Sequence, residues 1–145
     1  MADDAETLPP LTVVDAAGQL TFAIHEILTR VAAVHDLSVT QLRVLGILRD
    51  REPTMAALAA RLGLDRSSVT GLIDRAERRG HVVRGKSAAD ARVVTVALTD
   101  AGRALGTVLE DSVNTAVTAL LSGASPADRA ALVRITRSLP SRSSS

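Results

Sequence analysis

The sequence contains no cysteine, tryptophan or tyrosine, and Phe22 is its single aromatic residue. Without cysteine, a disulfide framework, a cysteine-ligated zinc site and a thiol-based oxidation switch are all excluded. With 46% hydrophobic residues the chain can still bury a core, which must consist of leucine, valine, isoleucine and alanine. A length of 145 residues suits one compact domain, or a small unit extended by helices that serve a subunit interface.

The signals for export, membrane insertion and catalysis are also missing. The start of the chain has no basic segment followed by an apolar run, and no apolar stretch approaches the ~18 residues of a membrane span. We therefore expect a cytoplasmic protein without a membrane partner. The histidines His25, His35 and His81 lack metal-ligand spacing, and neither a glycine-rich phosphate loop nor a Gly-x-Ser-x-Gly elbow is present. We expect no metal, no cofactor, no catalytic residue and no enzyme activity.

Charge is distributed unevenly along the chain. Residues 61–92 carry eight lysines and arginines against four acids, a net charge of +4, whereas residues 1–60 carry four arginines against eight acids, a net charge of −4. A locally basic segment is the electrostatic pattern expected where phosphates dock. A solvated basic face has the same composition, so the charge alone does not decide between these interpretations.

Helical periodicity dominates both ends of the sequence. Apolar residues spaced by three and four predict a long helix within residues 11–35, and similar faces predict helices over 100–121 and 126–139. These helices are more apolar than the flanks of a domain of this size need to be, so their faces must be covered. A two-fold partner would cover them, which favours a homodimer.

The middle of the chain has the pattern of two short helices joined by a sharp turn, after a helix predicted over residues 39–50. Thr54 can cap the first short helix, Gly63 can end it at positive φ, and Asp65 can cap the second. The apolar positions that hold such a pair together are all occupied as a helix-turn-helix requires. They are Leu58, Ala59, Leu62, Leu64, Val69 and Leu72. We therefore predict a helix-turn-helix over residues 54–79.

After Gly80 the hydrophobic period changes to two. Alternating residues predict a strand over 93–98, and residues 81–84 can form its partner. The small and polar residues 85–91 between them are typical of an exposed hairpin loop. The tip of this predicted wing carries three charged residues: Lys86, Asp90 and Arg92.

The second short helix and the wing present side chains suited to DNA. Short hydroxyl side chains let a helix approach base edges in the major groove, and arginines can donate to guanine or to phosphates. At the wing, Arg92 can enter a minor groove while Asp90 orients it through a forked ion pair. A solvated helix and an exposed ion pair of little energetic value are the alternatives. The predicted DNA-binding residues are Thr54, Arg66, Ser67, Ser68, Thr70, Gly71, Arg75, Arg78, Arg84, Lys86, Asp90 and Arg92.

Three segments resemble the MarR family of regulators in residue type, order and spacing: LSVTQLRVLGIL, MAALAARLGLDRSSVTGLIDRAERRGHVVR and DARVVTVALTDAG. The resemblance covers residues 37–102 and implies a homodimer that binds a pseudo-palindromic operator in double-stranded DNA. It implies a mainly α fold, a winged helix-turn-helix with a small β-hairpin wing and dimerisation helices at both termini. The wing motif of the family, Asp-Arg-Arg, reads Asp90-Ala91-Arg92 here, so the arginine credited with the minor-groove contact is present.

From these patterns we expect a single MarR-like chain in three parts. The parts are dimerisation helices at 11–37 and 100–139, a winged helix-turn-helix DNA-binding domain at 38–99, and flexible tails at 1–10 and 140–145.

Three functions fit this organisation. The leading hypothesis is a transcriptional regulator, a repressor, released by a small-molecule effector that binds between the dimer helices and the winged domain. Phe22, His25 and His35 are candidate effector-binding residues, although the histidines also fit ordinary, partly buried positions, and a regulator without an effector stays open. The second hypothesis is an architectural DNA-binding protein whose affinity varies little with sequence. The third is a winged-helix protein-interaction module that does not bind DNA.

Overall fold

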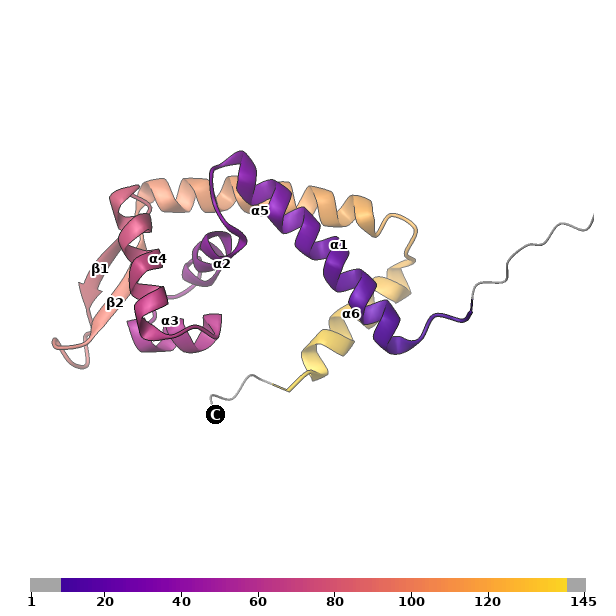
Figure 1. The fold of residues 1–145 in the computed structure, drawn as a ribbon, viewed down its shortest axis with the longest axis horizontal. Helices are drawn as coiled ribbons and strands as arrows, with labels where there is room; N and C mark the ends of the chain where they lie inside the picture. Colours follow the sequence, from indigo (N-terminus) through magenta and orange to yellow (C-terminus); the bar gives the residue numbers. More distant parts are fainter. Residues whose placement is uncertain (1–8, 141–145) are drawn as a thin grey trace, which may run out of the picture.

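The computed structural model describes residues 9–140, which form six α-helices and a two-stranded hairpin (Figure 1). A head at one end of the molecule contains α2, α3, α4 and the hairpin, and α1, α5 and α6 extend away from it as arms (Figure 1). The elements are α1 (Val13–Val34), α2 (Val39–Leu48), α3 (Met55–Leu62), α4 (Arg66–Arg78), β1 (Val82–Lys86), β2 (Val94–Leu98), α5 (Asp100–Leu120) and α6 (Pro126–Ser138). Residues 1–8 and 141–145, which make up most of the predicted tails, lie outside the described residues.

Helix boundaries follow from local capping chemistry. Each predicted cap side chain accepts a hydrogen bond from the backbone N–H three residues on, which satisfies one of the free donors at a helix start. The predicted caps Thr54 and Asp65 are confirmed in this way, and Ser38, Thr99 and Ser125 cap α2, α5 and α6 in the same manner. Gly63 adopts positive φ, at 67°, and ends α3 as predicted; Gly80 also adopts positive φ, at 76°, just after the end of α4. The first helix begins slightly inside its predicted range because Thr12 and Asp15 form a capping box there.

The hairpin is longer than the sequence indicated. The antiparallel register pairs Val82 with Leu98 and Lys86 with Val94, so β1 continues past the predicted end at residue 84. Lys86 therefore lies in the strand, and its predicted position at the tip is wrong. The extension is held because Ser87 still donates its backbone N–H to the Val93 carbonyl at 2.9 Å. The wing loop consequently consists of residues 87–93.

The hydrophobic core fills the head and continues between α1 and α5. Its largest fully buried side chains come from α2, α3, α4 and β2, and they are Leu48, Leu58, Ile73, Val69 and Val96. Leu64, which we expected to help hold the helix pair together, is 36% exposed. It lies directly after the positive-φ Gly63 in the turn, where it contributes a backbone hydrogen bond to the Ala59 carbonyl at 3.1 Å. The head is thus closed mainly by the leucines and valines of the helices themselves.

The start of α5 lies against the chain that leaves α4. Thr99 donates its hydroxyl to the Gly80 carbonyl at 2.6 Å and its backbone N–H to the His81 carbonyl at 3.0 Å. A Cβ atom on Gly102 would overlap that same His81 carbonyl. A glycine within a helix ordinarily weakens it, but here the close backbone contact requires glycine.

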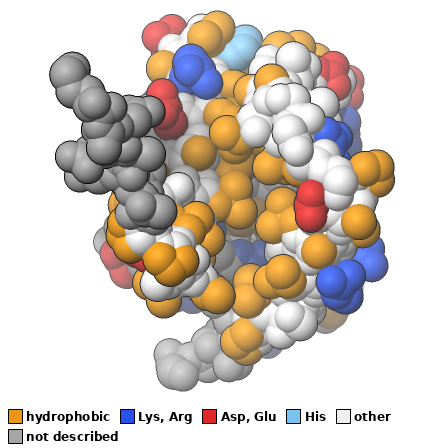
Figure 2. Space-filling view, turned by 90° about the vertical axis from the view of Figure 1, so that its right-hand side faces the viewer, with side chains coloured by type: hydrophobic (Ala, Val, Ile, Leu, Met, Phe, Trp, Pro, Cys, Tyr) orange, Lys and Arg blue, Asp and Glu red, His pale blue; other side chains and the backbone are white. Residues whose placement is uncertain are grey.

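The arms leave much apolar surface uncovered in the single chain. Figure 2 faces the end of the molecule where α6 and the outer ends of α1 and α5 lie, and hydrophobic side chains line a hollow along that face. The exposed residues on these elements, just before α1 and just after α6 include Leu11, Val13, Val14, Phe22, Leu120, Val133, Ile135 and Leu139. Among the described helices, none is by itself long and apolar enough to cross a membrane; α1 and α2 meet that test only as a pair bent by 88°.

Candidate nucleic-acid interface

The helix α4 turns its apolar stripe inward and its polar residues outward. Val69 and Ile73 are fully buried and Leu72 is nearly so, which fixes the rotation of the helix in the head. The opposite face therefore presents hydroxyl side chains near the helix start and arginines farther along, as the sequence predicted. Arg75 and Arg78 are both exposed on this face.

The hydroxyl groups of α4 already have internal acceptors. Ser67 Oγ donates to one oxygen of the Asp65 carboxylate at 2.7 Å, and Ser68 Oγ donates to the other at 2.8 Å. Thr70 Oγ1 donates to the Arg66 carbonyl at 2.9 Å. The hydrogen bonds that Asp65 accepts, first from the Ser67 hydroxyl and then from the Ser68 backbone N–H and hydroxyl, hold the pKa of Asp65 well below its usual range. Each hydroxyl consequently shows its lone pairs, and not its proton, to an approaching ligand.

Two hollows flank α4, so the helix forms a ridge between them. One, of about 530 Å³, lies between α3, α4 and the wing and is lined by residues that include Thr54, Arg66, Thr70, Arg84 and Arg92. The other, of about 420 Å³, lies toward the start of α2 and is lined by residues that include Ser67, Ser68, Gly71 and Arg75. The structure thus brings nine of the twelve predicted DNA-binding residues to the two sides of one protruding helix.

Arg84 has a different environment from the one we predicted. Its guanidinium contacts Asp74 Oδ1 at 2.6 Å and Glu77 Oε2 at 2.5 Å, and its side chain is only 30% exposed. The hydrogen bond that Arg84 donates to Asp74, with a further contribution from the one to Glu77, raises the pKa of Arg84. With both ends of its fork occupied, Arg84 ties β1 to α4 and is not a free contact for a phosphate. No feature of the sequence pattern identified this pairing.

The wing carries the forked ion pair that the sequence predicted. Arg92 Nε and Nη2 contact the two carboxylate oxygens of Asp90 at 3.1 and 3.2 Å, and the Arg92 backbone N–H donates to the same group at 3.0 Å. These contacts lower the pKa of Asp90. The Arg92 side chain is 90% exposed, so the guanidinium is oriented without being buried.

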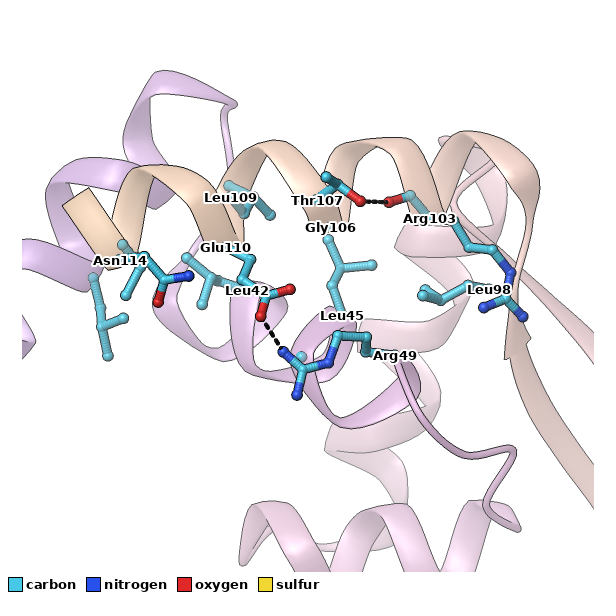
Figure 3. A pocket seen from close by; sticks show the side chains of 13 residues that line it. Leu42, Leu45, Arg49, Leu98, Arg103, Gly106, Thr107, Leu109, Glu110 and Asn114 are labelled. Carbon is cyan, nitrogen blue, oxygen red and sulfur yellow. Dashed lines mark hydrogen bonds and ion pairs between the residues drawn. The ribbon is translucent and has the colours of Figure 1, made fainter. Parts of the chain in front are cut away.

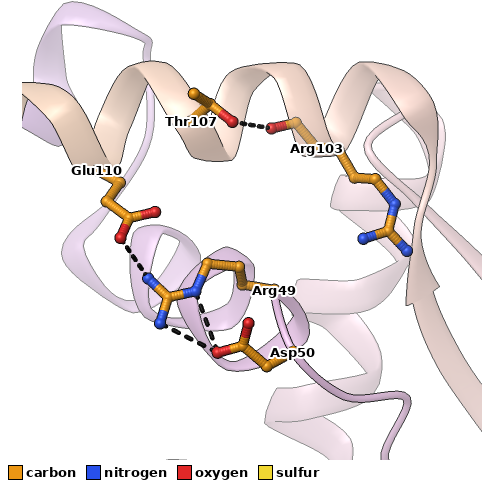
Figure 4. A network of polar contacts seen from close by, with 5 residues as sticks. All are labelled: Arg49, Asp50, Arg103, Thr107 and Glu110. Atoms are coloured by element: carbon orange, nitrogen blue, oxygen red, sulfur yellow. Dashed lines mark hydrogen bonds and ion pairs between the residues drawn. The ribbon is translucent and has the colours of Figure 1, made fainter.

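A separate apolar cavity of about 450 Å³ lies between α1, α2, α5 and β2 (Figure 3). Leucine side chains from all four elements line it, namely Leu28, Leu42, Leu45, Leu98 and Leu109. At its rim, Arg49 at the end of α2 contacts Glu110 of α5 at 2.6 Å and Asp50 at 3.0 Å (Figure 4). The Arg103 side chain also reaches this rim, on the side of Leu98 (Figure 3). The cavity therefore joins the arms to the head.

The predicted effector residues do not meet at this cavity. Phe22 is 75% exposed on α1 and lines a surface hollow with the residues just before that helix. His25 is exposed and His35 lies at the end of α1, and none of the three lines the leucine-walled cavity. Within residues 9–140, no group of three or more histidines and carboxylates is placed to hold a metal ion.

Comparison with known proteins agrees with this architecture. A family model described as MarR family matches residues 35–93. The HTH-type transcriptional regulator TtmR of Methylorubrum extorquens is 39% identical over 74 residues, which are 50% of this chain and 38% of that protein. The chain thus spans well under half the length of this relative.

Solved structures match over nearly the whole described chain. BpsR of Bordetella bronchiseptica, whose DNA binding is regulated by 6-hydroxynicotinic acid, superposes with a TM-score of 0.71 at 26% identity, covering 87% of this chain and 91% of BpsR. The repressor CouR bound to a 23-mer DNA duplex gives a TM-score of 0.74 at 26% identity, covering 87% and 90%. CouR from Rhodococcus jostii has also been solved with p-coumaroyl-CoA and matches at 25% identity with a TM-score of 0.74, covering 86% and 87%. The predicted winged helix-turn-helix fold is confirmed.

Proposed function

The chain belongs to the MarR family, and on this premise we propose that it is a sequence-specific DNA-binding transcriptional regulator. It binds a pseudo-palindromic operator as a homodimer and acts as a repressor. Residues 38–99 form the DNA-binding domain, and 11–37 and 100–139 form the dimerisation helices. A protein of this kind works on cytoplasmic DNA and has no enzyme activity of its own.

The observation that carries this proposal is the ridge of α4 between its two hollows. A helix that protrudes with both flanks open can enter a major groove, while the walls of the groove occupy the hollows on either side. The wing closes one of these hollows and carries Arg92 at its exposed edge. A guanidinium in that position can reach the adjacent minor groove, whose negative potential attracts it.

The hydroxyl geometry supports a proposal about which bases α4 reads. Because Ser67 and Ser68 donate to Asp65, their free lone pairs favour base edges that offer an amino group. In the major groove these are the N4 amino group of cytosine and the N6 amino group of adenine. Arg75 complements them, because a guanidinium donates to the O6 and N7 acceptors of guanine. We propose that the operator half-site combines both kinds of base.

The uncovered arms support a homodimer. The exposed apolar residues on α1, α5 and α6 (Figure 2) lie away from the DNA-reading head, so a partner can cover them without blocking α4. Two-fold symmetry would place two α4 helices about 34 Å apart, one turn of DNA. Sedimentation at equilibrium tests the dimer directly.

Selection from a random duplex library tests the sequence specificity. We expect a two-fold motif to be enriched and to compete against random duplex at fixed salt by a factor of about 10³ or more. Ser68→Leu should weaken binding to the selected motif and leave binding to random duplex nearly unchanged. Equal affinity for motif and random duplex would indicate an architectural DNA-binding protein, and no binding even at low salt would indicate a protein-interaction module.

We also propose that a small molecule regulates DNA binding from the leucine-walled cavity. Its volume lies in the range of ligand pockets, it touches both arms and head, and BpsR and CouR, which share the fold, are described with organic ligands. A ligand there shifts the population toward dimers with wrongly spaced α4 helices, because it binds those better. Release of labelled operator by a panel of small organic acids tests this. Gly106→Leu is the matched control for the cavity. A Cβ at Gly106 meets no atom within 4 Å, so the backbone tolerates the change, and the leucine side chain extends into the cavity where the ligand would bind.

A further inference from the structure

Arg79, the residue that caps the C-terminal end of α4, is hydrogen-bonded to the end of α1. Arg79 donates through Nη1 to the Asp36 carbonyl at 2.9 Å and through Nη2 to the His35 carbonyl at 3.0 Å. These carbonyls lie just past the final turn of α1, where backbone acceptors lack helical partners and the helix dipole is negative. Asp36 adopts φ 54°, a left-handed conformation that ends the helix at this point. A single guanidinium thus joins the DNA-reading helix to a dimerisation helix.

The residues after Arg79 are held by the other arm. Thr99 binds the Gly80 and His81 carbonyls, and Gly102 packs against His81 so closely that a Cβ would overlap it. Residues 79–81, which we call the junction, are therefore held by α1 on one side and by α5 on the other. No hydrogen bond or ion pair of residues 9–140 joins the side chains of α4 itself to either arm. The junction is consequently where the arms hold the end of α4.

We propose that Arg79 is a positioning residue that fixes the tilt of α4 relative to the arms and thereby sets the distance between the two half-sites that the dimer can read. This inference rests on the proposed function. The planar fork of arginine suits the role because it donates to two successive carbonyls at once and so fixes a direction. A lysine keeps the charge but offers a single ammonium that can point to either carbonyl.

If Arg79 has this role, its substitution should change how strongly DNA affinity depends on the spacing between the two half-sites. Once the operator has been selected, two further duplexes are made from it, one with a base pair added at its centre and one with a base pair removed. Either change turns one half-site by about 35° relative to the other. We expect wild-type affinity to fall at least about tenfold on either duplex. In Arg79→Ala and Arg79→Lys the same change should cost no more than about threefold, because α4 can now tilt to follow the displaced site.

The salt dependence separates positioning from a direct DNA contact. Loss of a phosphate contact lowers the slope of log affinity against log salt by about one unit, whereas Arg79→Ala should leave the slope unchanged. Arg129→Ala is the matched control: Arg129 donates in the same way to carbonyls after α5, those of Leu121 at 2.9 Å and Ala124 at 3.3 Å, but it contacts no part of the head. The Arg129→Ala variant should lose as much affinity as the wild type when the half-site spacing is changed.

The outcomes decide between the inference and the proposed function. An undiminished spacing preference in both Arg79 variants, or a lower salt slope in Arg79→Ala, overturns the positioning role. A wild type that shows no preference between operator and random duplex overturns the proposed function instead. If Arg79→Ala fails to fold, as judged by far-UV circular dichroism at equal protein concentration, Arg79→Lys alone gives the answer, since it retains the charge and one hydrogen bond.

Discussion

Two glycines on the same face of α5, four residues apart, should respond to alanine in opposite directions. At Gly102 a Cβ would overlap the His81 carbonyl oxygen and lie 2.9 Å from its carbonyl carbon, whereas at Gly106 it would meet nothing within 4 Å. The overlap is with backbone, so no side-chain rotation relieves it. The start of α5 must therefore move away from the junction in Gly102→Ala.

The magnitude follows from three contributions. Overpacking of a tight contact costs about 1–3 kcal/mol. Displacing α5 also stretches the two hydrogen bonds of Thr99 to the junction, each worth about 1 kcal/mol. The higher helix propensity of alanine offsets about 1 kcal/mol of this loss in the free energy of unfolding. Gly102→Ala should lower the free energy of unfolding by about 1–4 kcal/mol, and Gly106→Ala should raise it by up to about 1 kcal/mol.

Urea denaturation followed by far-UV circular dichroism measures both effects, since the chain has no tryptophan or tyrosine to report by fluorescence. All samples are compared at one protein concentration, because dimer formation adds to apparent stability. If Gly102→Ala is as stable as the wild type, or if both substitutions shift the midpoint in the same direction, the close contact between α5 and the junction is refuted.

Three further predictions concern the head. Arg92→Ala should weaken binding to operator and random duplex alike and lower the salt slope by about one unit; an unchanged titration removes Arg92 from the interface. Arg84→Met should weaken DNA binding because it uncovers the Asp74 and Glu77 carboxylates next to the phosphates, yet should cost at most about 1 kcal/mol of stability, since the two carboxylates are already 44% and 43% exposed to water; intact affinity would contradict this. Burial, and secondarily Arg79, lowers the pKa of His81 below 6.5, so unfolding free energy should decline as pH falls below about 6.5, where the unfolded chain binds a proton that the folded chain resists. In urea titrations at pH 7.5 and 5.5, His81→Asn should lose less unfolding free energy at the lower pH than the wild type does. An equal loss in both proteins would refute the lowered pKa of His81.

Features that depend on neighbours in sequence could be predicted. Caps such as Thr54 and Asp65 need only a hydroxyl or carboxylate three residues before a backbone donor, and the stop at Gly63 needs only a residue that tolerates positive φ. The pair of Asp90 and Arg92 lies within one loop, so its geometry was also accessible. The fold class followed because these local signals and the hydrophobic period agree with one another.

Features that depend on tertiary contact could not be predicted. Arg84 was predicted to contact DNA because its partners lie on another element, and nothing in the sequence marks Gly102 as essential because its close neighbour is the backbone of residue 81. The cavity was missed for a different reason. Its leucines, such as Leu42 and Leu45, have the spacing of ordinary core positions, whereas the sequence suggested an effector site at an aromatic residue and two histidines.

The hydrogen bonds from Ser67 and Ser68 to Asp65 have a consequence for how such a protein could change its target. Both serine hydroxyls point their protons at Asp65 because that carboxylate, the cap of α4, accepts from them. Asp65→Asn would keep a cap, but its amide can both donate and accept, so the serine hydroxyls would be free to turn their protons outward. New operators could then be recognised without any change in the side chains that touch them, and a residue usually assigned to helix stability would be part of the recognition code.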